Sequence, residues 1–269
     1  PQDHKVMLRA AASLVAGNAG IRELLPALRT DWEKATTAQE RLDLGLLLGY
    51  GYETVQDGAS LKTISADILA KYPDSYVALE LAGNADTLLK DWNFSNSILA
   101  AQLTKHPDDE NLLRLKARSA EGQGNFVLAR QTRQKLFDNG KANSNDYNGY
   151  AWTALFDDKT DDVVIKAAQQ ATMLTHNSTF GDMHTLACLY AAQGRTTEAR
   201  DLLLKAMAIQ NLSEPNSAVW FGLGSIYEKY GVTDAAIEAY RKVEKPEGQF
   251  DPTSTWLLAQ VRLKVLGAT

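Results

Sequence analysis

The feature that most constrains this chain is a helix-breaking motif that returns at a fixed interval. Lys71-Tyr72-Pro73-Asp74 and Lys105-His106-Pro107-Asp108 lie 34 residues apart, and the same step leads through further polar breaks to Pro246. Five steps from Pro73 to Pro246 cover 173 residues, a mean of 34.6. A period of this length is typical of repeated supersecondary units, which bury their apolar faces only by stacking on one another. The sequence therefore predicts about six stacked units in place of one globular core.

Each period is divided near its middle by a second polar or glycine-containing break. Glycine suits such a break because the end of a helix often needs a left-handed residue, and proline stops a helix by removing a backbone donor. The pattern predicts two short antiparallel helices in each unit, joined by a tight turn, and hence an all-α chain. The breaks lie at residues 56–58, 91–93, 122–125, 157–162, 193–195 and 230–233.

The clearest unit begins at Trp220. Its residues match the consensus W-x2-L-G-x2-Y followed by A-x3-F and a terminal proline, so the chain resembles the tetratricopeptide repeat family. The resemblance implies a right-handed superhelical solenoid of antiparallel helix pairs, whose concave groove is lined by the first helix of each unit. The matching residues are Trp220, Leu223, Gly224, Tyr227, Ala236, Tyr240 and Pro246.

Partial copies of the motif occur in the preceding units. A small residue recurs at one position, and in three units a tyrosine follows it three residues later. We expect the small residue to lie where the two helices of one unit approach closely. The small residues are Gly49, Gly83, Ala117, Ala187 and Gly224. The segment 91–103 fits the consensus loosely, which predicts an irregular region there.

The period predicts three parts in the chain. Residues 41–250 form six tetratricopeptide-like units in one solenoid, and residues 251–269 form a C-terminal capping helix. Residues 1–40 form an N-terminal helical pair, at about 5–16 and 21–34, which is either a cap or a degenerate repeat. Pro26 should kink the second helix of this pair or lie in its first turn. Because the chain starts at Pro1 without methionine, we interpret it as the C-terminal array of a larger protein.

Composition argues against several classes of function. A net charge near -5 and a pI near 5.5, without a cluster of Lys and Arg, argue against nucleic acid as a partner. No apolar run reaches the roughly 18 to 20 residues of a membrane span, and no signal pattern opens the chain. We therefore expect a soluble protein without direct membrane insertion, in an unknown compartment. The single cysteine, Cys188, excludes an intramolecular disulfide and a cysteine-based zinc site.

Few residues could carry chemistry. His184 and Cys188 lie at i and i+4 on one predicted helix, as a base and a thiol could, but no third partner is within reach in the sequence. The acidic stretch 157–162 lacks the spacing of a calcium loop. We therefore expect no enzyme activity, no cofactor and no metal. The alternative is a helical-array enzyme or a carbohydrate-binding module, which would place stacked aromatics and two convergent acids in the groove.

The expected groove follows from the family resemblance. We expect a scaffold or adaptor that binds a peptide or protein of unknown identity along the first helices. Asn84, Arg114 and Arg118 are candidates for a patch that accepts an anion or an acidic peptide, because amides and guanidinium groups donate to carboxylates. The candidate groove residues are Glu80, Asn84, Asn111, Arg114, Arg118, Asn148, Thr153, His184, Phe221 and Ser225.

Overall fold

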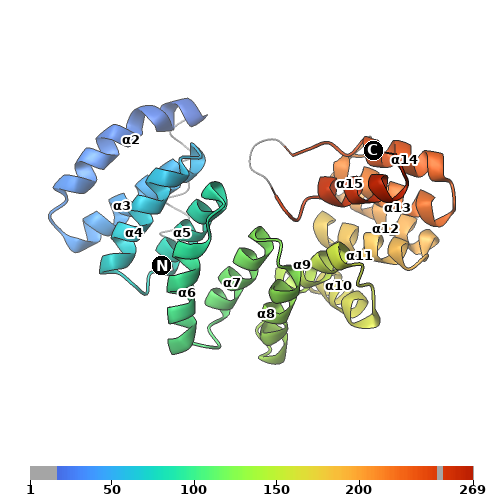
Figure 1. Ribbon diagram of the computed structural model, residues 1–269, viewed down its shortest axis with the longest axis horizontal. Helices are drawn as coiled ribbons and strands as arrows, with labels where there is room; N and C mark the ends of the chain where they lie inside the picture. Colours follow the sequence, from blue (N-terminus) through green and yellow to red (C-terminus); the bar gives the residue numbers. More distant parts are fainter. Residues whose placement is uncertain (1–16, 247–250, 269) are drawn as a thin grey trace. The chain divides into compact units, whose positions relative to one another are not determined.

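The computed structural model describes residues 17–246 and 251–268. Within these ranges every regular element is a helix, as expected (Figure 1). The chain divides into two compact blocks between Ser119 and Ala120. We call them the N-terminal block and the C-terminal block. The helix that the sequence predicts over 5–16 lies outside the described residues. None of the described helices is both long and apolar enough to cross a membrane.

The helices end close to the breaks that the sequence predicts. In the N-terminal block they are α2 (Gly17–Lys34), α3 (Ala38–Thr54), α4 (Gly58–Lys71), α5 (Tyr76–Leu89), α6 (Asn93–Lys105) and α7 (Glu110–Gly122), the last of which crosses the block boundary. In the C-terminal block they are α8 (Phe126–Asp138), α9 (Ser144–Ala154), the 3-10 helix η1 (Leu155–Asp157), α10 (Asp162–Leu174), α11 (Phe180–Ala192), α12 (Thr196–Ile209), α13 (Ser217–Lys229), α14 (Thr233–Arg241) and α15 (Thr255–Val265).

Consecutive helices pack on one another from α2 to α6 in the N-terminal block and from α8 to α15 in the C-terminal block. The first helices of neighbouring pairs also pack together, α3 on α5 in the N-terminal block and α9 on α11 on α13 in the C-terminal block. Each block has its own apolar core, centred on Leu48, Leu61 and Leu81 in the N-terminal block and on Leu189 and Leu203 in the C-terminal block. This arrangement confirms an all-helical fold built of packed adjacent helix pairs.

The turns inside the pairs use a left-handed residue, as the sequence predicts, but glycine provides it in only half of them. An L-residue in this conformation is disfavoured by contact between its β-carbon and the backbone, so these turns are held by the packing around them. The residues with positive φ are Gly124, Gly194 and Gly231 in three turns, and Gln56, Lys90 and Asp158 in the other three.

The small residues of the motif do not share one packing role. At Gly224 a β-carbon would lie 2.6 Å from the ring of Tyr240 in the same pair, which confirms the expected close approach. At Gly49 it would lie 2.5 Å from Leu81, which belongs to the next pair. At Gly83 it would have no neighbour within 4 Å, so the expectation is wrong there. Close packing therefore explains Gly224 and Gly49 but leaves Gly83 without a steric reason.

Pro26 lies in the interior of α2, well past its first turn. Its carbonyl accepts a hydrogen bond from the Thr30 hydroxyl at 3.0 Å. Trp32 in the same helix is buried, and the guanidinium groups of Arg29 and Arg41 lie 4.7 and 4.6 Å from its ring centre. Trp32 is thus an aromatic contact between a cation of its own helix and a cation of α3.

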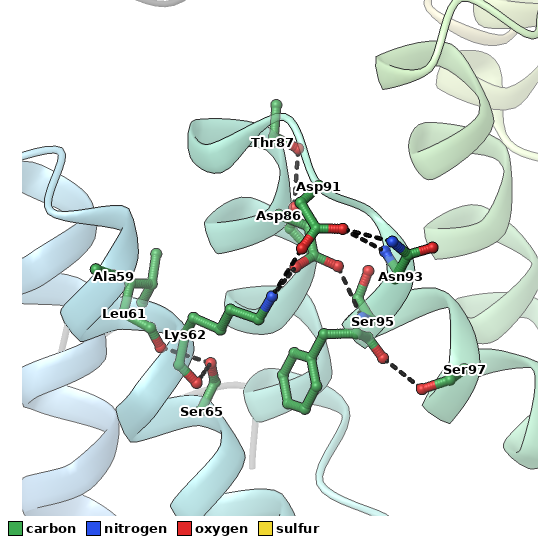
Figure 2. Close-up of polar contacts among 12 residues, drawn as sticks. Ala59, Leu61, Lys62, Ser65, Asp86, Thr87, Asp91, Asn93, Ser95 and Ser97 are labelled. Carbon is green, nitrogen blue, oxygen red and sulfur yellow. Dashed lines mark hydrogen bonds and ion pairs between the residues drawn. The ribbon is translucent and has the colours of Figure 1, made fainter.

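The α5–α6 turn, in the segment expected to be irregular, contains a polar cluster (Figure 2). The residue before α6, Trp92, makes no side-chain capping bond. Instead the carboxylate of Asp86, on α5, accepts the backbone N–H of Ser95 at 2.7 Å. Lys62 of α4 lies 3.1 Å from Asp91 and 3.9 Å from Asp86. Because helix N-termini carry unpaired donors and a partial positive charge, Asp86 caps α6 from the preceding helix.

Candidate functional site

Three of the predicted groove residues meet in the N-terminal block. Glu80 and Asn84 are on α5, and Arg118 is on α7. The Nη2 atom of Arg118 donates to Oε1 of Glu80 at 3.3 Å, and Nδ2 of Asn84 donates to Oε1 of Glu53, on α3, at 2.8 Å. The three first helices α3, α5 and α7 therefore contribute polar groups to one surface.

A small pocket of about 50 Å³ lies at this surface. Its apolar lining comes from three leucines, and Gly83 leaves it open where another residue would place a side chain. Glu80, Asn84 and Arg118 line it together with the hydroxyl groups of neighbouring residues. The complete lining is Leu79, Glu80, Gly83, Asn84, Thr87, Ser95, Leu99, Leu115, Arg118 and Ser119. The open space explains Gly83 where close helix packing does not.

The electrostatics of the surface are balanced. Arg118 pairs with Glu80, and Arg114 pairs with Glu110 at 3.4 Å on its own helix. The side chain of Arg118 is 51% exposed whereas that of Glu80 is 10% exposed, so the arginine is the side of the pair that an incoming molecule meets. Burial raises the pKa of the nearby Tyr76 hydroxyl, and the Glu80 carboxylate acts in the same direction.

The other two predicted residues of this block lie apart from that pocket. Asn111 is exposed in the first turn of α7 and lines a separate pocket beside Tyr76 and His106. Arg114 is half-buried one turn further along α7, and it lines neither pocket. The structure therefore brings together Glu80, Asn84 and Arg118 at one pocket, whereas Asn111 lines another. Arg114 acts on the Tyr76 hydroxyl, as Glu80 and Arg118 do, but it does not line that pocket.

In the C-terminal block the predicted groove residues are mostly enclosed. Thr153 is fully buried and its hydroxyl donates to the Gly149 carbonyl at 2.8 Å. His184 and Phe221 are each 4% exposed. Ser225 is half-buried and donates to the Phe221 carbonyl at 3.1 Å, and Asn148 is half-buried on α9. These residues pack inside the block instead of forming an open polar surface.

The pair of His184 and Cys188 has the proximity that its i, i+4 spacing predicts, with Nε2 and Sγ 3.4 Å apart. However, Nε2 lies 2.8 Å from the Ala218 carbonyl, an acceptor, so this nitrogen carries the proton and donates it there. Burial lowers the pKa of His184 to about 4 and raises the pKa of the Cys188 thiol. The histidine is therefore a neutral donor, and the thiol stays protonated where a nucleophile needs a thiolate.

Sequence reasoning missed a polar contact between α13 and α15. Arg262 forms an ion pair with Glu228, and the Tyr240 hydroxyl donates to the same carboxylate at 2.9 Å. The two charged residues are 34 residues apart, one repeat length. Their equivalent positions in the period and their opposite charges could therefore have indicated an ion pair from the sequence. They line a pocket of about 220 Å³ whose walls also include Leu155, Cys188 and Leu258.

Comparison with known proteins places the chain in a structural class. The tetratricopeptide repeat family matches residues 217–245, which form the pair α13–α14. A tetratricopeptide repeat protein from Parabacteroides merdae ATCC 43184 shares 14% identity over 97% of this chain and 100% of its own, with a TM-score of 0.64. A chain of the APC/C hetero-tetramer Cut9-Hcn1 shares 16% identity over 96% of this chain, with a TM-score of 0.57. No curated protein matches the sequence.

The present chain covers 49% of the matched chain in the Cut9-Hcn1 complex, so it spans about half of that length. At these identities the likeness to solved structures establishes the fold alone. The fold defines a class of helix-pair repeat proteins that act generally as interaction scaffolds and are typically not enzymes. Residues 217–245 match the tetratricopeptide repeat family, and the chain as a whole has the fold of tetratricopeptide repeat proteins.

Proposed function

We propose that the chain is an interaction scaffold that binds an extended peptide segment of a partner protein on α5 and α7. The observation that carries this proposal is the pocket at Gly83, which has an apolar floor and a rim formed by Glu80, Asn84 and Arg118. A helical glycine without a packing neighbour lowers helix stability by about 1 kcal/mol relative to alanine. The open space accounts for the glycine at this position, because a side chain of the partner can enter there.

The polar rim indicates the chemistry of the peptide. Arg118 offers exposed donors, and the amide of Asn84 has both a donor and an acceptor group. Alternating donors and acceptors suit the backbone amides of an extended chain, and the pocket suits one aliphatic side chain. The acidic-peptide hypothesis is weakened, because Asn84, Arg114 and Arg118 each already contact a carboxylate. We therefore expect a neutral or weakly charged peptide.

The six helix pairs from α3–α4 to α13–α14 are the proposed repeats of this scaffold. The alternative of a carbohydrate-binding module or helical-array enzyme requires stacked aromatic side chains and two convergent acids in the groove. Around Trp152 the aromatic rings of Phe156, His184 and Phe221 lie within 6.4 Å of it, but they contribute to the packed core of the C-terminal block. This arrangement favours a protein or peptide ligand over a sugar.

The test begins with selection of peptides from a random display library against the full chain. One enriched peptide is labelled and titrated by fluorescence polarisation into the wild type, Arg118→Glu and Gly83→Leu. We expect both substitutions to weaken binding at least about tenfold, the first by reversing a charge and the second by filling the pocket. The matched control is Arg200→Glu, because Arg200 is also exposed and paired but lies on α12.

Circular dichroism of each variant checks that the helices remain folded. Equal affinity of the peptide for all four proteins would place the binding surface elsewhere and remove the proposed site. Failure to enrich any peptide that binds more tightly than about 1 mM would remove the proposed function itself.

A further inference from the structure

The chain's last described segment makes a contact that regular stacking does not explain. Nε1 of Trp152, on α9, donates to the carbonyl of Thr253 at 2.8 Å, across 101 residues of sequence. The α9 helix opens the fourth pair, whereas residues 251–268 follow the sixth. In a repeat array each unit contacts its neighbours, so a seventh first helix would rest on α13 and α14 alone. Here α15 does pack on α13 and α14, but its leading segment also returns to α9.

Apolar side chains attach this segment to the same block. Leu258, Ala259 and Leu263 are buried in one cluster with Phe221 and Tyr240. Side chains from α9 and η1, among them Trp152 and Phe156, pack against that cluster. The segment therefore lies over the first helices α9, α11 and α13, where a bound partner of a tetratricopeptide array would lie. This position also contributes to the burial of Phe221.

A charged contact fixes the orientation of α15. Arg262 pairs with Glu228 of α13, and the Tyr240 hydroxyl donates to the same carboxylate. Leu258 and Arg262 are one helical turn apart, and both line the 220 Å³ pocket opposite Leu155 and Cys188. The space between these residues shows that the segment fills this surface incompletely.

The outer face of α15 differs from that of a terminal cap. A capping unit presents polar residues to solvent, whereas Val261 and Val265 are 58% and 63% exposed. Apolar residues on the outer face give no benefit to a permanent cap. They are compatible with a helix that is held by Leu258, Ala259 and Leu263 and can leave.

We propose that residues 251–268 are an internal ligand seated on a helix-binding surface of α9, α11 and α13. The external partner of this surface is an amphipathic helix that displaces them. It carries the same anchors as α15: an aliphatic residue at i, a small residue at i+1, arginine at i+4 and an aliphatic residue at i+5. The surface is separate from the pocket at Gly83, so either proposal can fail while the other stands.

The test uses the full chain and a labelled synthetic peptide of residues 251–269. In Leu258→Asp/Leu263→Asp the internal ligand loses its anchors, while the receptor surface keeps all its residues. Occupation of a site by a resident competitor reduces the apparent affinity in proportion to the unoccupied fraction. We therefore expect the wild-type peptide to bind this variant at least about tenfold more tightly than the wild-type chain. The matched control, Val261→Asp/Val265→Asp, changes the exposed face of α15 and should bind like the wild type.

A second pair of variants locates the binding surface. We call the chain with Leu258→Asp/Leu263→Asp the unanchored chain. Adding Glu228→Arg to it should abolish binding of the wild-type peptide, and a peptide with Arg262→Glu should restore binding. Equal affinity of the wild-type peptide for the unanchored and wild-type chains would overturn the proposal, as would binding that ignores Glu228. Loss of amide-exchange protection throughout α9–α14 in the unanchored chain would also overturn it, because α15 would then be a structural part of the block.

Discussion

At the scale of single residues, His184 shows how a neighbouring repeat determines the chemistry of a side chain. Its ring is stacked on Phe180, with centres 5.7 Å apart, and lies 5.5 Å from Trp152. The Ala218 carbonyl is its polar partner at 2.8 Å. Enclosure by aromatic rings excludes the water that would stabilise an imidazolium ion, so burial lowers the pKa of His184 to about 4.

This shift predicts a loss of stability in mild acid. The unfolded chain binds the proton with a pKa near 6.5 and the folded chain near 4, so stability is complete above about pH 6.5 and falls as the pH approaches 4. Between pH 7 and pH 5 we expect His184 to lower the free energy of unfolding by about 2 kcal/mol. Urea unfolding of the wild type and His184→Gln at both pH values measures this difference, which the variant should lack.

His106→Gln is the matched control, because His106 is exposed at the end of α6. The free energy of unfolding of His106→Gln should depend on pH as that of the wild type does. If His184→Gln retained the full wild-type dependence, protonation of His184 would have no part in the acid sensitivity.

Residue pairs near in sequence were predictable, and those set by a neighbouring pair of helices were not. The i, i+4 spacing placed His184 beside Cys188, as the structure confirms. The Ala218 carbonyl comes from the following pair, and without it the tautomer could not be assigned. The motif likewise predicted close packing at Gly224, where Tyr240 is in the same pair, but misjudged Gly83, whose surroundings depend on α6 and α7.

At the scale of helices, α6 begins with a cap taken from another element. Asp86 is fully buried on α5 and accepts the Ser95 N–H, while Lys62 of α4 lies at the edge of the cluster (Figure 2). Burial raises the pKa of the Asp86 carboxyl, against the opposing effects of the Ser95 hydrogen bond and of Lys62. The carboxylate therefore stabilises the fold chiefly as a hydrogen-bond acceptor, whereas burial of its charge lowers stability.

This balance predicts different effects for two substitutions of Asp86. Asp86→Ala removes the acceptor and leaves a buried N–H unpaired, so the free energy of unfolding should fall by about 2 kcal/mol. Asp86→Asn keeps an acceptor oxygen and removes the buried charge, so it should change stability by less than about 1 kcal/mol. Chemical denaturation of both variants compares them directly.

Asp91→Asn tests the role of charge in the same cluster, because Asp91 also pairs with Lys62 but its side chain is 45% exposed. It should destabilise the chain less than Asp86→Ala does. Equal losses in Asp86→Ala and Asp86→Asn would show that the ion pair, and not the hydrogen bond to Ser95, holds the start of α6. The sequence could not reveal this cap, because Asp86 lies in the preceding helix, seven residues before α6 begins.

At the scale of the whole chain, the 34-residue period contained most of the fold and little of the surface chemistry. Helix limits and pair order follow from local signals such as the polar breaks, and the structure reproduces them. The groove residues were predicted only from their positions within the period. In the structure Arg118 does line a pocket, but Thr153 is buried in a core. The contact between Trp152 and Thr253 spans 101 residues and has no periodic signature. Long-range returns of this kind depend on the path of the assembled helices.

The repeat architecture also predicts how damage to the core spreads. Leu203 on α12 is 2% exposed, and it packs against Gly222 of α13 as well as residues of α11. Leu203→Ala should lower stability by about 3 kcal/mol through the cavity that it leaves. Because the units of a repeat array contact chiefly their neighbours, the opening should stay within the C-terminal block. Hydrogen–deuterium exchange should accelerate in α11, α12 and α13 while α4 and α5 keep wild-type rates.

Leu204→Ala is the matched control, since Leu204 is 58% exposed, and it should change the exchange rates of neither region. Equal acceleration in all helices of Leu203→Ala would mean that the chain opens as one cooperative unit, against the nearest-neighbour behaviour of a repeat array.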